Sequence, residues 1–287
     1  MRKLALAAAL LLAASSAQAR TILFIGNSFT YGANSAVHYY KADTVTDLNG
    51  PANGKTVGGV PAIFKAFTKE AGLDYTVSLE TVGGKGLDFH VTEKRAVIDK
   101  PWDEVVMHGY STMDQAHPGD PALLISSTRQ ISDLLRARNP DVRLHLLATW
   151  ARADQVYPAN APAVWKGKPV QQMGRDVMAG NVAAAKGANI ADVIPLGLAW
   201  NRAIDTGVAD DNPYDDIGAS KIDLWAYDHY HASSFGYYLE ALMDFGKVTG
   251  QDPLVLAGTD QVAEALGISP AQSKALMQVA HDTLAAK

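Results

Sequence analysis

Three residues near the two ends of the chain have the types and spacing of a catalytic triad. Ser28 closes the block IGNS, and Asp228 and His231 stand three residues apart in the stretch YDHYHASSFG. A serine hydroxyl is a poor nucleophile near pH 7, so it needs a base within hydrogen-bond reach and a third group that orients that base. One tight turn can bring the carboxylate to one ring nitrogen of the histidine and leave the other for the serine. An isolated serine after a strand is more often a helix N-cap, but the Asp-x-x-His pair favours Ser28 as nucleophile, His231 as base and Asp228 as the orienting acid.

Other motifs fail on their spacing. The stretch GPANGKT at 50–56 has three residues between its glycines where a phosphate loop has four, and VGGKG at 82–86 lacks the third glycine of a dinucleotide fingerprint. His229 and His231 have no third metal ligand in sequence, so no metal site is expected. The G-x-S-x-G elbow of α/β-hydrolases is absent as well, because Phe29 and Thr30 follow Ser28.

The elements that must position the triad alternate along the chain. Apolar, β-rich runs occur at 21–26, 75–82, 102–109, 142–150 and 189–196. Runs this continuously apolar are typical of strands buried on both faces, as in a parallel sheet. Helical patterns lie between and after them, at 60–72, 121–139, 169–187 and 235–250, and SPAQ at 269–272 announces a capped helix near the end. The sequence therefore predicts an α/β fold: a three-layer, doubly wound, flavodoxin-like parallel five-stranded sheet with helices on both faces.

One segment does not follow this alternation. Residues 31–57 are weakly patterned and long for a connection. They are expected to form an insertion over the site or a lid.

The first nineteen residues have the pattern of a signal peptide. Arg2 and Lys3 precede an apolar run, and Ala17-Gln18-Ala19 supplies a small-x-small cleavage site. The run is shorter than the roughly 20 residues of a spanning helix, so no stable membrane anchor is expected. The sequence predicts cleavage after Ala19, a periplasmic or secreted protein, and one domain over 20–287.

Composition excludes some classes of partner and of stabilisation. The chain has 0 cysteines, so an ordinary core must hold it together even in an oxidising compartment. The net charge is −5, with acidic and basic residues mixed along the chain. Nucleic acid is therefore not an expected partner.

The two blocks that carry the triad resemble those of the SGNH/GDSL hydrolase superfamily. IGNSFT ends the first predicted strand, and DHYHASSFGYYLEA is similar to the closing Asp-x-x-His block of that family. The blocks lie at opposite ends of the mature chain, so the resemblance covers nearly all of it. It implies an SGNH hydrolase fold, a Ser28-His231-Asp228 triad and ester hydrolysis without a cofactor.

The resemblance also implies an oxyanion hole. The Ser28 amide is one donor, and a glycine after the second predicted strand is another, with Gly86 the first choice and Gly84 the alternative. The third block departs from the usual Gly-x-Asn-Asp, because the strand is followed by HGYSTMD. Ser111 falls where the asparagine would be, and His108 is the alternative donor.

The same departure bears on the substrate. HGYS is similar to the QGES of carbohydrate-active members, which favours acetyl or other short acyl esters of polysaccharides. Lipid or aryl esters, acyl transfer to an alcohol other than water, and a non-catalytic glycan-binding protein are the alternatives. Asn27, Trp150 and Arg152 are the predicted substrate-binding residues, although Asn27 also suits a loop brace and Trp150 also suits the core.

Overall fold

The computed structural model describes residues 19–51 and 55–286, and within them one parallel sheet organises the chain. Its strands run in the order β2-β3-β1-β4-β5-β6, and all of their pairings are parallel. The strands are β1 (Arg20–Gly26), β2 (Thr46–Asp47), β3 (Tyr75–Thr81), β4 (Glu104–Met107), β5 (Arg143–Leu147) and β6 (Asp192–Ile194).

The sheet has six strands, so the predicted number of five was wrong. The extra strand, β2, consists of two residues paired to the outer edge of β3, and it lies in the weakly patterned segment 31–57. Two residues are too few to show an apolar period. All five predicted strands are present, and without β2 their order is the doubly wound, flavodoxin-like one.

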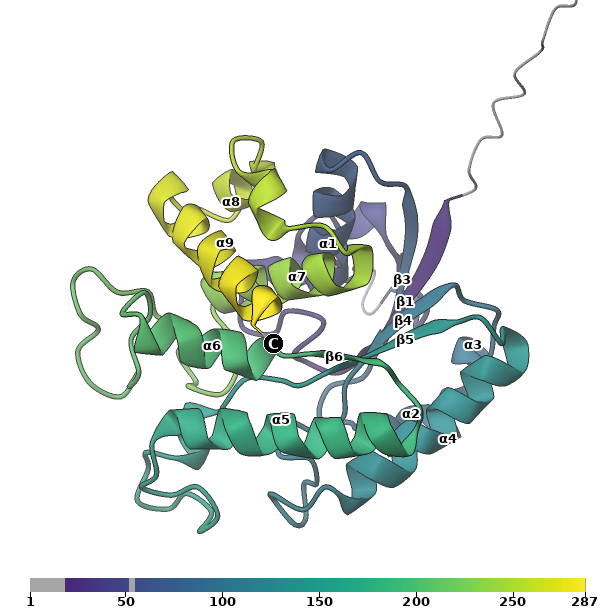
Figure 1. Cartoon of the computed structure of the whole chain (residues 1–287), viewed down its shortest axis with the longest axis horizontal. Coiled ribbons are helices and arrows are strands. Elements are labelled where there is room, and N and C mark those ends of the chain that lie inside the picture. Colours follow the sequence, from purple (N-terminus) through teal and green to yellow (C-terminus); the bar gives the residue numbers. More distant parts are fainter. Residues whose placement is uncertain (1–18, 52–54, 287) are drawn as a thin grey trace, which may run out of the picture.

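Helices cover both faces of the sheet (Figure 1). The helix α1 (Gly59–Glu70) and the helix α7 (Ser234–Thr249) lie on one side, and α2 (Leu87–Glu93), α4 (Ala122–Arg138) and α5 (Val170–Gly187) lie on the other. The remaining helices are α3 (Arg95–Ile98), α6 (Leu196–Asp205), α8 (Gln261–Ala265) and α9 (Pro270–Ala285), with 3-10 turns η1 (Ala36–Tyr39), η2 (Ala42–Thr44), η3 (Ala153–Gln155) and η4 (Pro253–Leu256). The predicted three-layer architecture is confirmed.

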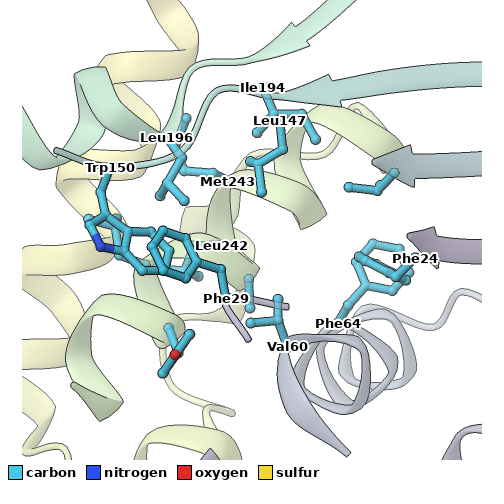
Figure 2. Packing of buried hydrophobic residues seen from close by; sticks show 14 of the residues in the cluster. Phe24, Phe29, Val60, Phe64, Leu147, Trp150, Ile194, Leu196, Leu242 and Met243 are labelled. Carbon is cyan, nitrogen blue, oxygen red and sulfur yellow. The ribbon is translucent and has the colours of Figure 1, made fainter. Parts of the chain in front are cut away.

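Burial explains why the first strand reads as continuously apolar. Residues 22–25 of β1 are at most 1% exposed, because β1 lies in the middle of the sheet with helices on both faces. Figure 2 shows part of the core, where Phe24 faces Phe64 of α1 while Leu242 and Met243 of α7 pack towards the ends of the strands. Because α7 follows the Asp-x-x-His block directly, this packing fixes the block against the sheet.

Side-chain caps begin the helices α9 and α7, and the sequence analysis predicted only the cap of α9. Ser269 and Gln272 make a reciprocal capping box at the start of α9, as predicted. Ser233, two residues after His231, caps α7 by accepting a hydrogen bond from the Gly236 amide. This second cap fixes the point at which the chain leaves the Asp-x-x-His turn and enters the helix.

The described part of segment 31–57 is packed against the body of the protein. It contains η1, η2 and β2, with Val37 fully buried and Tyr40 nearly so. The predicted signal peptide falls on residues 1–19, of which 1–18 lie outside the described residues. Among the helices of 19–51 and 55–286, none has the length and apolar character needed to cross a membrane.

Candidate active site

Loops that follow four neighbouring strands meet at one edge of the sheet. In a parallel sheet all carboxyl ends lie at the same edge, and here these ends lead into residues 27–35 after β1, 82–86 after β3, 108–115 after β4 and 148–155 after β5. The chain goes from β1 outward to β3 and then returns to β4 on the other side of β1. This edge is therefore the topological switch point, where open α/β sheets bind ligands.

Ser28 lies two residues beyond β1, in a loop that both α1 and α7 hold in place. The Ala33 amide donates to the Ser28 carbonyl oxygen at 3.0 Å. The hydroxyl of Tyr237 on α7 donates to the same oxygen at 3.3 Å and to the Ala33 carbonyl at 3.0 Å. On the α1 side, the Val60 amide donates to the Thr30 carbonyl at 2.9 Å. These bonds make the position of Ser28 a property of the packed helices and not of the loop alone.

Asn27 ties this loop to the turn after β3. Its side-chain nitrogen donates to the Lys85 carbonyl at 2.9 Å, and its side-chain oxygen accepts from the Phe29 amide at 3.1 Å. Asn27 is 6% exposed. With both ends of its amide bonded within the protein, Asn27 serves as a brace between two strand-end loops, one of its two predicted roles.

Asp228 and His231 form a tightly constrained pair. Nδ1 of His231 donates to Oδ2 of Asp228 at 2.6 Å. The other carboxylate oxygen accepts from the backbone amides of Tyr230 at 3.2 Å and His231 at 3.0 Å. Burial raises the pKa of Asp228, but these hydrogen bonds outweigh burial and hold that pKa below its usual value. Asp228 is therefore a carboxylate across the neutral range and keeps the proton of His231 on Nδ1.

The other ring nitrogen of His231 is available. Nε2 is buried and has no hydrogen-bond partner among the described residues, and no hydrogen bond joins it to the hydroxyl of Ser28. The ring packs edge-on against Phe29, the neighbour of Ser28, with centroids 5.7 Å apart, and lies 4.2 Å from the ring of Tyr230. Hydrogen bonds to a catalytic base are often long before substrate binds. The structure thus brings the predicted base next to the loop of the predicted nucleophile.

Asn34 is a site residue that the sequence analysis did not identify. Its side-chain nitrogen donates to Oδ2 of Asp228 at 2.7 Å and lies 3.3 Å from Nδ1 of His231. Its φ of 60° lies in the left-handed region, which asparagine tolerates better than most residues. No periodicity or motif marks this position, because its partner is 194 residues away.

The two candidate oxyanion glycines differ in their surroundings. Gly86 is buried at the start of α2, where an added Cβ would clash with the ring of Tyr110. Gly84 is exposed, has a φ of +70°, and its amide makes no hydrogen bond within the described residues. Gly84 also lines a small cavity with Asn27. The surroundings therefore favour Gly84, the alternative, over Gly86.

This small cavity also contains Ser111 and Arg152. Its volume is about 30 Å³, and Tyr230, next to His231, forms part of its wall. Arg152 is held by a two-pronged ion pair with Asp154, at 2.9 and 2.5 Å, and its guanidinium lies 3.6 Å from the centroid of the Tyr230 ring. Nη1 of Arg152 donates to Oγ of Ser111 at 3.4 Å. Two of the predicted site residues thus come together in a cavity beside the Ser28 loop.

His108 is not free to donate to an oxyanion. Its Nδ1 donates to the Gly109 carbonyl at 2.9 Å, which leaves Nε2 to accept from the Thr30 hydroxyl at 2.8 Å. Burial lowers the pKa of His108 to about 4, so the ring is neutral at ordinary pH. The alternative role of His108 as an oxyanion donor does not fit this arrangement, and His108 instead anchors the Ser28 loop through Thr30.

Trp150 is a core residue, so its predicted contact with substrate does not fit the structure. It is 0% exposed and stacks on Phe29 at 3.8 Å, a contact that Figure 2 shows, and on Trp200 at 5.1 Å. Its indole nitrogen donates to the Tyr230 carbonyl at 3.2 Å. A ring enclosed in this way cannot stack on a ligand, but it supports both the Ser28 loop and the Asp-x-x-His turn.

His229 lies in the turn between Asp228 and His231. Its ring lies 4.1 Å from that of Tyr214, and its φ of 55° turns the chain between Asp228 and His231. In residues 19–51 and 55–286, no group of three or more His, Cys, Asp or Glu side chains is placed to hold a metal ion.

Comparison with solved structures gives the fold a context. A DUF4886 family protein from Bacteroides uniformis matches with a TM-score of 0.61 and 18% identity, covering 92% of this chain and 94% of its own. A "putative GDSL-like lipase" from Parabacteroides merdae matches with a TM-score of 0.52 and 13% identity over 81% of this chain and 96% of its own. An alpha/beta hydrolase enzyme from the metagenome of Lake Arreo, Spain, matches with a TM-score of 0.51 and 15% identity over 80% of this chain and 95% of its own.

These likenesses lie at 13 to 18% identity and show a shared fold. The resemblance to SGNH/GDSL hydrolases that the two sequence blocks predict is thereby confirmed for the fold. A scan against protein-family models finds no match, and a search of the curated proteins finds none.

Proposed function

We propose that this protein is an exported serine esterase that hydrolyses short acyl esters, acetyl esters of carbohydrates above all. The observation that carries the proposal is the Asp228-His231 pair beside a nucleophile loop at the carboxyl end of β1. Nδ1 of His231 is 2.6 Å from Oδ2 of Asp228, and Nε2 has no partner among the residues that the structure describes. A buried histidine whose tautomer is set by a carboxylate is what a serine needs as a base. The shared fold of a GDSL-like protein supports the same conclusion.

The reaction proceeds through an acyl-enzyme. Oγ of Ser28 attacks the ester carbonyl carbon while Nε2 of His231 takes the hydroxyl proton. The tetrahedral oxyanion accepts hydrogen bonds from the backbone amides of Ser28 and Gly84, with the Ser111 hydroxyl as a side-chain donor. The intermediate collapses, the alcohol leaves with the proton from His231, and the acyl group stays on Ser28.

Hydrolysis then repeats these steps with water. His231 takes a proton from a water molecule whose oxygen attacks the acyl carbon, and the second intermediate releases the carboxylic acid and returns the proton to Ser28. Asp228 remains ionised throughout and stabilises the imidazolium that forms twice in the cycle. No step needs a metal or an organic cofactor.

The small cavity favours a short acyl group. A single water molecule needs about 10–15 Å³ of such space, so the roughly 30 Å³ beside Asn27, Gly84 and Ser111 has room for a small group and not for a long chain. A long acyl chain would need an extended apolar channel there, and the cavity wall includes Arg152 and Gln115. This favours acetyl esters over lipid esters.

The test uses the chain from Arg20 onward. Wild type is expected to release p-nitrophenol from p-nitrophenyl acetate and to react covalently with a fluorophosphonate at Ser28. Ser28→Ala and His231→Ala should lose turnover to background, roughly a 10⁴-fold or greater loss for members of such a triad, while circular dichroism shows them folded. If a second alcohol is supplied and its acetyl ester forms in place of free acetate, the protein is a transferase.

The departure of the third block from Gly-x-Asn-Asp is the one observation that favours a second candidate, a glycan-binding protein without catalysis. Such a protein would bind saccharides but leave every ester and the fluorophosphonate untouched. That result with folded wild-type protein would replace the esterase proposal.

A further inference from the structure

A groove lined by tyrosines adjoins the acid of the Asp-x-x-His pair. It has a volume of about 570 Å³ and is lined by Tyr31, Ala33, Asn34, Ser35, Ala36, His38, Tyr39 and Tyr227. Asn34 connects it to the site, since its side chain donates to Asp228 at 2.7 Å. Tyr227 precedes Asp228 directly, so one wall of the groove is continuous with the catalytic turn.

Two of these tyrosines are exposed. Tyr227 is 79% exposed and Tyr39 is 55% exposed, whereas Tyr31 is half-buried and Phe29 and Trp150 are buried. None of the aromatic or cation–π contacts among the described residues involves Tyr227, whereas Tyr39 packs edge-on against His38 at 4.3 Å and has Lys55 Nζ 5.3 Å from its ring centroid. A solvent-exposed aromatic ring in a groove provides a flat apolar face with a polar edge for a ligand.

The lining combines apolar and polar side chains. It contains no Asp, Glu, Lys or Arg. Nδ1 of His38 donates to the Tyr31 carbonyl at 2.9 Å, which leaves Nε2 for a ligand. Tyrosine hydroxyls and Ser35 add further donors and acceptors. A ligand with apolar ring faces and many hydroxyls matches this lining.

We infer that this groove, here called the tyrosine groove (Tyr31, Asn34, His38, Tyr39 and Tyr227), binds the sugar ring of the alcohol half of the substrate, with Tyr227 as its main stacking platform. The inference rests on the proposed esterase function and adds the position of the leaving group. The acyl group enters the small cavity on the Gly84 side of the nucleophile loop, and the pyranose ring lies on the Asp228 side. The C–H face of a pyranose packs on an aromatic ring in the manner of weak C–H contacts.

The experiment compares two acetyl esters with different alcohols. Ethyl acetate has an alcohol too small to occupy the groove, whereas an acetylated xylo-oligosaccharide carries sugar rings, and acetate release is measured for both. The ratio of kcat/KM for the sugar ester to that for ethyl acetate is expected to fall about tenfold in Tyr227→Ala and about threefold in Tyr39→Ala. Such changes match the loss of one aromatic contact, about 0.5–1.5 kcal/mol. Tyr227→Phe keeps the ring and should retain the wild-type ratio within about twofold.

Val182→Ala is the matched surface control, because Val182 is 48% exposed on α5, outside the groove, and its ratio should equal that of wild type. An unchanged ratio in both alanine variants would overturn the inference. A fall in kcat/KM for phenyl acetate without a fall in kcat/KM for the sugar ester would also overturn it. Ser28-dependent release of acetate from ethyl acetate in wild type separates these outcomes from failure of the esterase proposal. If wild type releases no acetate, binding of the unacetylated oligosaccharide to wild type and Tyr227→Ala, measured by calorimetry, tests the groove directly.

Discussion

The side-chain nitrogen of Asn34 donates a hydrogen bond of 2.7 Å to Oδ2 of Asp228, across 194 residues of sequence. The same carboxylate oxygen accepts from Nδ1 of His231 at 2.6 Å. Asn34 therefore holds the acid from one side while the histidine binds it from the other. The position of the acid depends on a residue from the opposite end of the chain.

Asn34→Ala is expected to lower kcat/KM for p-nitrophenyl acetate by about tenfold to a hundredfold, the loss of one hydrogen bond to a charged group. Asn189→Ala is a matched control, since Asn189 is an exposed asparagine with a similar left-handed φ of 53°. Equal losses in the two variants would mean that backbone strain alone explains the effect.

Gly26→Ala should destabilise the fold by about 1–3 kcal/mol, as overpacking does. A Cβ at Gly26 would lie within 3.0 Å of both the Thr30 hydroxyl and the ring of His108. Urea unfolding measures the change. Gly187→Ala is the control, because its Cβ would meet Ile125 at an ordinary 3.5 Å and alanine favours the helix. A Gly26→Ala protein as stable as wild type would show that Thr30 and His108 can make room for the added Cβ.

His108 predicts a pH dependence of stability. Burial lowers its folded pKa to about 4, against an unfolded value of about 6.5. Between these values the unfolded chain binds a proton that the folded protein does not, so stability is lost as the pH falls from about 6.5 to 4, by up to about 3 kcal/mol. Denaturant unfolding of His108→Gln should show a smaller loss over this interval. If the free energy of unfolding depends on pH in the same way for the variant and wild type, His108 is not the group responsible.

The burial of Asp244 predicts a pH dependence of stability with the opposite sign. Asp244 and Glu240 are buried on α7, and burial raises the pKa of each carboxyl well above its usual value. Above about pH 4 the unfolded chain loses these protons while the folded protein keeps them, so stability falls as the pH rises. The loss continues up to the folded pKa.

Asp244→Asn removes this titration and keeps a neutral side chain of the same shape. Its free energy of unfolding is expected to exceed that of wild type at pH 8, and the difference should shrink towards pH 4. The comparison of variant with wild type at each pH isolates Asp244 from the opposing effect of His108. A difference that does not change with pH would indicate that Asp244 ionises in the folded protein.

The elements of this fold could be predicted because their signals are local. The run TILFIG is apolar at every position that β1 buries, and SPAQ contains both halves of the capping box that starts α9. The Asp-x-x-His spacing also predicted a local contact, because a single turn from Asp228 to His231 forms it. The two-residue strand β2 escaped prediction, since pairing to β3 and not a pattern of its own makes it a strand.

The parallel sheet, its helices and the two blocks at the sheet edge could be predicted from local patterns, because hydrophobic periodicity, helix caps and short spacings involve residues close together in the sequence. Other contacts became visible only in the folded protein: Trp150 is enclosed between Phe29 and Trp200, the Thr30 hydroxyl bonds to Nε2 of His108, and Asn34 donates to Asp228. These contacts join residues 78 to 194 positions apart, or rings from separate elements. Side chains so distant in sequence meet only when the sheet and both helical layers pack together, so no local pattern records them.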